Sequence, residues 1–131
     1  MFEADLVRAW NSHDGRQVAA LYAEGGVRHQ VALEEARYVG RDAVGAAAQD
    51  ILDAWPDAVL EARTVVTQGN TVVVEWTFRG THRRDYGPLP AHGEATELNG
   101  VSAFDLAEGL VTEERVYWDG ATLMASAGLL G

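Results

Sequence analysis

The sequence has 131 residues, a net charge of -10, and neither cysteine nor lysine, so all ten basic residues are arginines. This acidity argues against nucleic acids and anionic membranes as partners, because both need clustered positive charge. The missing side chains exclude disulfides, thiolate chemistry and Schiff-base catalysis. No leader pattern and no apolar run of membrane-spanning length is found. We therefore expect a single cytoplasmic domain over residues 1–131.

The first half of the chain is patterned as helices followed by short strands. Apolar residues first recur at helical spacing and then alternate as in a strand. They return to helical spacing in a last segment, which a proline ends. The patterns predict two helices, a short strand, a weak edge strand and a long helix, which are Phe2–Asn11, Gly15–Ala23, Val27–Val31, Glu34–Val39 and Gly40 to about Ala54.

The second half of the chain is patterned as long strands. Two antiparallel pairs are predicted, separated by a long irregular link over Gly80–Gly93 and followed by a short terminal helix. The four strands are Ala58–Thr67, Thr71–Arg79, Ala95–Leu106 and Leu110–Trp118. Helices that precede such a meander indicate an α+β fold in which the helices cover one sheet face. The strands carry apolar residues on both faces, so we expect a homodimer through the outer face of the sheet.

The chain lacks the motifs of the common cofactor and metal sites. No phosphate-binding glycine loop, dinucleotide fingerprint or nucleophile elbow is present. His82 and His92 flank the long link, but their spacing is not that of a metal site. Because cysteine and lysine are also missing, any proton-transfer or carbon–carbon chemistry must run through carboxylates, histidine, tyrosine or water.

Several motifs along the chain carry a family resemblance. They are WNSHD at 10–14, YAE at 22–24, His29, GRDAV at 40–44, WPD at 55–57, EWTFRGTH at 75–82, LPAHG at 89–93 and YWDGATLM at 117–124. Together they make the sequence similar to the SnoaL-like polyketide cyclases of the nuclear-transport-factor-2-like superfamily. The resemblance implies a cone-shaped α+β fold with a curved, mainly antiparallel sheet, and a hydrophobic small molecule as substrate.

The resemblance also assigns catalytic roles. Asp119 matches the acid/base aspartate of the cyclases, which moves protons during an aldol ring closure without metal or cofactor. A carboxylate with this role needs a pKa raised by an apolar pocket. The structural alternative is that Asp119 caps the terminal helix. His29 matches a pocket position and could assist Asp119, or it could be a hydrogen-bonded core imidazole.

Nine further residues are candidates for substrate binding. The aromatic side chains suit a flat ligand but also suit the core, the polar strand residues could line the pocket or form ion pairs, and the two histidines could frame its mouth or lie in an exposed loop. The candidates are Tyr22, Trp10, Trp55, Trp76, Tyr117, Glu75, Arg115, His82 and His92.

The sequence thus predicts a cofactor-independent cyclase or isomerase for a hydrophobic, polyketide-like carbonyl compound. Two alternatives remain open at this point. One is epoxide opening or dehydration in the same pocket, with Glu75 as a second carboxylate near Asp119. The other is a binding module that sequesters a small molecule without turnover.

Overall fold

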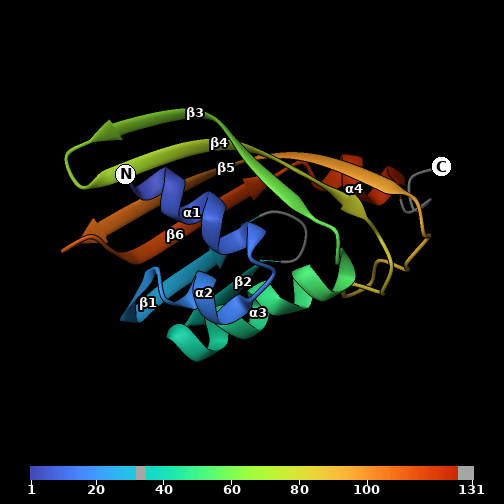
Figure 1. Cartoon of the computed structure of the whole chain (residues 1–131), viewed down its shortest axis with the longest axis horizontal. Helices are drawn as coiled ribbons and strands as arrows, with labels where there is room; N and C mark the ends of the chain where they lie inside the picture. Colours follow the sequence, from blue (N-terminus) through green and yellow to red (C-terminus); the bar gives the residue numbers. More distant parts are fainter. Residues whose placement is uncertain (32–34, 127–131) are drawn as a thin grey trace.

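The computed structural model describes residues 1–31 and 35–126. Within them, four helices and six strands follow the predicted order of helices, short strands, a long helix and long strands (Figure 1). The elements are α1 (Phe2–Asn11), α2 (Gly15–Ala19), β1 (Tyr22–Gln30), β2 (Ala36–Val39), α3 (Arg41–Ala54), β3 (Val59–Gln68), β4 (Thr71–Thr81), β5 (Ala95–Ala107), β6 (Leu110–Trp118) and α4 (Gly120–Ser126).

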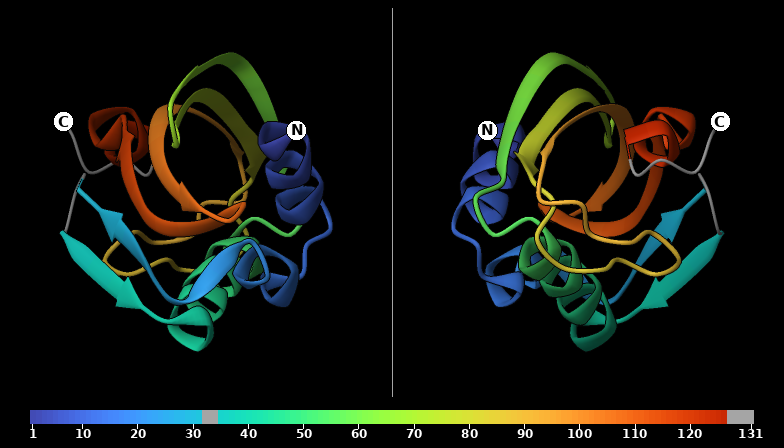
Figure 2. Two further views of the ribbon diagram at one scale, coloured as in Figure 1. Left: turned by 90° about the vertical axis from the view of Figure 1, so that its left-hand side faces the viewer. Right: turned by 90° about the vertical axis from the view of Figure 1, so that its right-hand side faces the viewer.

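The six strands form one curved sheet in the order β2-β1-β6-β5-β4-β3. All neighbours are antiparallel except β1 and β6, which run parallel. Irregular pairing between Ala62 and Thr64 and between Asp105 and Leu106 bends the long strands. Figure 2 shows the result, an arch of β3 to β6 with α1 and α3 on its open side. The α+β cone is therefore confirmed.

The prediction of a second helix to Ala23 is wrong in its C-terminal half. The helix ends at Ala19, and β1 begins three residues later at Tyr22. The sheet captures this stretch, because the backbone N–H of Val111 donates to the Leu21 carbonyl at 2.9 Å and Tyr22 pairs with Val111. Sheet pairing outweighs the helical spacing of the side chains.

The helices are fixed to the sheet by close contacts. The Asn11 side chain pairs with the backbone of Leu60, accepting from its N–H at 2.7 Å and donating to its carbonyl at 3.1 Å, so the end of α1 is fastened to β3. Helices α2 and α3 cross at Gly15 and Gly45, where an added Cβ on Gly15 would lie 2.3 Å from the Gly45 carbonyl oxygen. In the part of the chain that the structure describes, no helix has the length and apolarity needed to span a membrane.

Candidate functional site

The concave side of the sheet and the helices enclose a cavity of about 670 Å³, counting the part that is open to solvent. Most of its wall is apolar, and all four tryptophans of the chain contribute to it. The lining residues are Leu6, Trp10, Arg28, Gln30, Ile51, Trp55, Leu60, Trp76, Phe78, Tyr86, Thr96, Leu98, Ser102, Phe104, Glu114, Val116, Trp118 and Leu123. Among the described residues, Arg28 and Glu114 are the charged members of this lining.

Arg28 and Glu114 form a buried ion pair in the cavity wall. They face each other in the parallel pairing of β1 with β6, and the Arg28 Nη1 donates to Glu114 Oε1 at 2.8 Å. The Tyr22 hydroxyl donates to the same carboxylate oxygen. The side chains of Arg28 and Glu114 are only 7% and 3% exposed. The Arg28 guanidinium also lies over the Trp10 ring, 5.4 Å from its centroid.

Burial and charge shift the protonation of this cluster. Burial raises the pKa of the Tyr22 phenol well above its usual value, and the adjacent Glu114 carboxylate raises it further. Burial is the largest single effect on Arg28 and by itself lowers the pKa of its guanidinium, but Glu114, Tyr22 and Tyr86 together outweigh it and the net shift is upward. The cluster therefore holds a permanent cation beside a neutral phenol.

A second polar group reaches the cavity from the segment between β4 and β5. Tyr86 hydrogen-bonds Gln30, and burial raises the pKa of its phenol to about 12, although the nearby Arg28 charge acts in the opposite direction. Deeper under the sheet, Trp76 Nε1 donates to the Ser102 hydroxyl at 3.1 Å. The Trp76 ring lies over Gly100, where an added Cβ would be 2.2 Å from the ring. The absence of a side chain at Gly100 therefore leaves the space that the Trp76 ring occupies in the cavity wall.

The fold and cavity agree with the comparisons to known proteins. The sequence matches the SnoaL-like polyketide cyclase family over residues 4–127. The chain belongs to this family. No curated protein matches it.

Solved structures share the fold of this SnoaL-like chain at low sequence identity. IdmH of Streptomyces antibioticus, a proposed polyketide cyclase, is 23% identical with a TM-score of 0.78, over 97% of this chain and 96% of that one. A proposed SnoaL-like polyketide cyclase of a Jannaschia species is 20% identical with a TM-score of 0.82, over 99% of this chain and 92% of that one. A Catenulispora acidiphila protein with a ketosteroid isomerase-like fold, in complex with trimethylamine, is 14% identical with a TM-score of 0.85, over 98% of this chain and 92% of that one. At such identities these likenesses show the fold alone.

Asp119 of the SnoaL-like chain lies at the end of β6 and caps α4. Its carboxylate accepts from the Thr122 backbone N–H at 3.0 Å and from the Thr122 hydroxyl at 2.5 Å. Asp119 is exposed and is not among the cavity-lining residues. These hydrogen bonds lower the pKa of Asp119, so the expectation of a raised pKa is wrong. The capping alternative describes this geometry, and a role in acid–base chemistry stays a prediction.

Four other predicted site residues lie on the outer face of the sheet. His29 hydrogen-bonds Glu35 at 2.8 Å, on the side of β1 opposite Arg28. Glu75 accepts from the Thr64 hydroxyl at 2.8 Å and is exposed. The same face carries the other two, Arg115 and Tyr117, of which Tyr117 is 47% exposed.

This outward placement has two consequences for the predicted chemistry. Glu75 cannot supply the second carboxylate that epoxide opening or dehydration needs in the cavity. Arg115 pairs with Asp105 at 2.8 Å, with Glu113 at 3.9 Å as a weaker neighbour, so the expected ion pair exists but with a different main partner.

The three tryptophan candidates fall on the cavity side. Trp10, Trp55 and Trp76 line the cavity, while Tyr22 lies outside the lining and reaches it through Glu114. His82 is fully buried, which contradicts the exposed-loop alternative. Its ring stacks on Trp55 with 4.4 Å between centroids, and the half-buried His92 approaches it edge-on at 5.1 Å.

Sequence reasoning missed Arg28, Gln30 and Glu114. The valines beside His29 drew attention to the wrong face of β1, since an apolar face was assumed to be the inner one. In β6 a usable signal existed, because Glu114 is in phase with Val116 and Trp118. A carboxylate on the buried, apolar side of a strand needs a cation or hydrogen-bond donors as partners. Buried charged pairs of this kind indicate candidate functional sites.

Proposed function

We propose that the protein is a cofactor-independent cyclase or isomerase that acts on a hydrophobic carbonyl compound bound in the cavity. The observation that carries this proposal is the Arg28–Glu114 pair, which lies in the wall of a largely apolar cavity. Such a cavity binds the apolar body of a ligand while a few polar groups fix its orientation.

The polar groups suit proton transfer next to a carbonyl. As the C–H bond breaks, negative charge moves to the carbonyl oxygen, which then needs hydrogen-bond donors. Among the described residues, the buried Nε–H of Arg28 has no hydrogen-bond partner, so it can donate to that oxygen. The Tyr86 phenol, which also lines the cavity and stays protonated at neutral pH, can serve as a second donor to that oxygen.

Glu114 is our assignment for the base. Its two hydrogen bonds within the described residues both fall on Oε1, so Oε2 is the oxygen that takes the proton from the substrate carbon. In an isomerisation the proton returns to another carbon. In an aldol closure the enolate carbon bonds to a second carbonyl carbon, and the proton returns to the new alkoxide.

Asp119 is the rival assignment, implied by the family. It stands next to the lining residue Trp118, and the helix that it caps contributes Leu123 to the cavity. Its carboxylate would have to release Thr122 before it could act as a base. The two assignments predict opposite results for two isosteric variants, Glu114→Gln and Asp119→Asn.

A ring-closure assay on an anthraquinone-type polyketide ester compares wild type with these variants. We expect Glu114→Gln to lose about 10²- to 10⁴-fold in kcat and Asp119→Asn to stay within a few-fold. Rates are referred to the folded fraction, because Glu114→Gln also removes the partner of a buried charge. The reverse pattern would assign Asp119 as the base.

Ligand binding is followed separately through tryptophan fluorescence, since all four tryptophans line the cavity. Tight binding without turnover by any form would favour the binding-module alternative. The absence of both binding and turnover across hydrophobic ketones and esters would refute the proposal.

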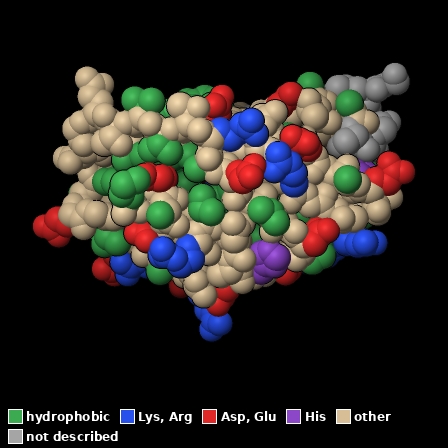
Figure 3. All heavy atoms as spheres, turned by 45° about the horizontal axis from the view of Figure 1, so that its top comes forward, with side chains coloured by type: hydrophobic (Ala, Val, Ile, Leu, Met, Phe, Trp, Pro, Cys, Tyr) green, Lys and Arg blue, Asp and Glu red, His purple; other side chains and the backbone are tan. Residues whose placement is uncertain are grey.

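We further propose that two copies associate through the outer face of the sheet. Val66 and Val101 are 58% and 36% exposed there, and Figure 3 shows hydrophobic side chains among the polar ones on the side that carries β3. Sedimentation should give a dimer, and Val66→Asp should dissociate it, because a charge would enter an apolar contact. Val65→Asp, at the neighbouring partly exposed valine that faces the opposite side of β3, is the control. A wild-type monomer at micromolar concentration would contradict this proposal.

A further inference from the structure

Three side chains near the segment between β4 and β5 each have a buried polar atom without a hydrogen-bond partner. Within the described residues these atoms are Trp55 Nε1, Thr96 Oγ1 and His92 Nε2. Trp55 and Thr96 line the cavity, while His82 is fully buried behind Trp55 and has the Arg84 backbone as a hydrogen-bonding neighbour. Buried polar groups are nearly always hydrogen-bonded, so three neighbouring groups without partners indicate that something absent from the chain itself satisfies them.

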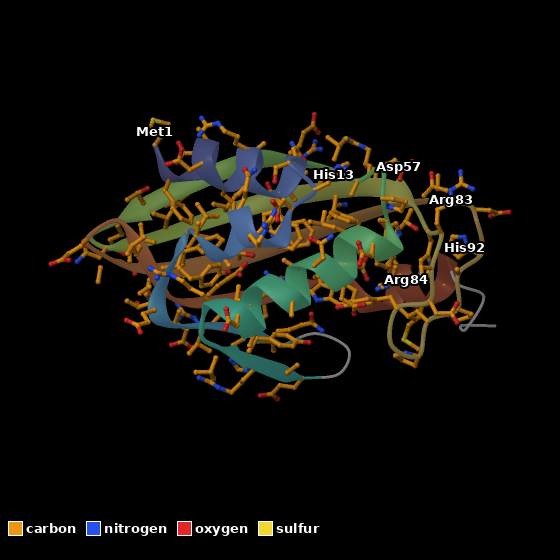
Figure 4. All side chains as sticks on the ribbon, turned by 60° about the horizontal axis from the view of Figure 1, so that its bottom comes forward. Met1, His13, Asp57, Arg83, Arg84 and His92 are labelled. Carbon is orange, nitrogen blue, oxygen red and sulfur yellow. The ribbon has the colours of Figure 1, made fainter. Side chains whose placement is uncertain are left out.

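These three side chains and His82 adjoin one another. His82 stacks on Trp55 with an angle of 15° between the rings, and His92 meets His82 edge-on at 85°. Gly80 pairs with Thr96 across the sheet, and an added Cβ on Gly80 would lie 3.2 Å from the Trp55 Cβ. Thr96, on the same face as that Cβ, therefore lies next to Trp55. In Figure 4, the labelled His92 lies at the end of the molecule beyond the C-terminus of α3.

These atoms are donors. The indole N–H of Trp55 can only donate, and the Thr96 hydroxyl has a proton to give. His92 Nδ1 accepts from the Glu94 backbone N–H at 3.0 Å, so the neutral ring carries its proton on Nε2. The group that fits is therefore a hydrogen-bond acceptor.

We propose that Trp55 and Thr96, both in the cavity lining, form a second polar subsite together with the neighbouring His92, and that this subsite binds a carbonyl oxygen of the ligand. The Tyr86 ring lies 5.5 Å from that of Trp55, and its hydroxyl bonds Gln30, so Tyr86 separates this subsite from Arg28. The inference rests on the function proposed above and narrows its substrate class. The substrate then carries two separated carbonyl groups, one at Arg28 and one at this subsite, joined by an apolar body.

Two other occupants fit less well. A metal ion would need a third ligand, and no cluster of three metal-binding side chains exists among residues 1–31 and 35–126. A carboxylate would need a cation, and none of the three subsite residues Trp55, Thr96 and His92 is a permanent one, in a chain whose net charge is -10. A neutral carbonyl oxygen satisfies the donors without either.

The test compares two ketones that differ by one acceptor, 2,6-diacetylnaphthalene and 2-acetylnaphthalene, by equilibrium dialysis. Wild type should bind the diketone about tenfold more tightly, the gain of one well-placed hydrogen bond to buried donors. Thr96→Val should reduce that ratio to about two or less. Thr77→Val should keep it, because the equally buried Thr77 is not in the lining. Equal affinities in wild type, or an unchanged ratio in Thr96→Val, would overturn the subsite. If neither ketone binds, the proposed function itself fails.

Melting of the ligand-free protein gives an independent check. Thr96→Val replaces an unpartnered hydroxyl with a methyl group, so its Tm should equal or exceed that of wild type. Thr77→Val should melt lower, because the Thr77 hydroxyl donates to Asn99 at 2.8 Å and accepts from Arg63 at 3.2 Å. An equal loss of Tm in the two variants would show that the Thr96 hydroxyl is already satisfied without a ligand, which would overturn the inference.

Discussion

The Arg28–Glu114 pair allows a stability prediction with a defined magnitude. Glu114→Gln keeps the shape of the side chain but removes its charge, so the Arg28 guanidinium is left buried without a counter-ion. With 7% and 3% of the two side chains exposed, solvent screens this charge poorly. Removing one partner of a buried pair costs about 3–5 kcal/mol. At about 3–5 °C per kcal/mol for a chain of this size, Tm should fall by about 10–20 °C.

Urea and thermal unfolding at neutral pH measure this loss. The matched control is Glu61→Gln, which breaks the Arg79–Glu61 pair of similar length, 2.9 Å, on the surface. Its side chains are 44% and 56% exposed, so solvent screens the pair and the loss should be far smaller than that of Glu114→Gln. The double variant Arg28→Met/Glu114→Gln should recover much of the lost stability, because no unpaired charge remains. If Glu114→Gln costs no more than Glu61→Gln, the view of this pair as a desolvated cluster is refuted.

Two further predictions concern single positions. Burial lowers the pKa of His82 from its usual value of 6.5. Between pH 6.5 and the lower pKa of the folded state, the unfolded chain binds a proton that the folded chain does not. The free energy of unfolding should therefore decrease as the pH decreases through this range, by at most about 1.4 kcal/mol per pH unit. His82→Phe keeps the stacked ring and should remove this dependence between about pH 5 and 7, whereas an unchanged slope would contradict its origin in His82. Gly100→Ala places a Cβ 2.2 Å from the Trp76 ring and should cost about 1–3 kcal/mol and weaken ligand binding. Gly25→Ala, where the added Cβ has no neighbour within 4 Å, should change urea unfolding little; equal costs for both would show that Trp76 moves freely.

Much of the fold could be predicted from local pattern. The first helix, Phe2–Asn11, has the predicted bounds, because its apolar spacing was uninterrupted. The hairpin of β5 and β6 was predicted from a short link, and in the structure Glu108 and Gly109 both have positive φ, as a tight turn between twisted strands requires. The end of α2 was not predictable in this way, since pairing with β6, about ninety residues away, decides it.

The candidate site divides along the same line. Trp10, Trp55 and Trp76 could be named from their residue types and positions, and all three line the cavity, as does Trp118, which was not among the candidates. The orientation of β1 could not be predicted, because a shift of one residue in its register decides whether His29 or Arg28 faces inward. That register is set by pairing with β6, which aligns Arg28 with Glu114, 86 positions further along the chain.

The sequence by itself determined the family and the order of the elements, because both depend on residues that are close together in the chain. It offered the capping of α4 by Asp119 as one of two alternatives, and the structure shows that hydrogen bond. Only the tertiary structure decided which polar groups are buried together. The Arg28–Glu114 pair and the stack of His82 on Trp55 join distant segments, and their energies depend on the exclusion of water, which the packing of the whole cone produces.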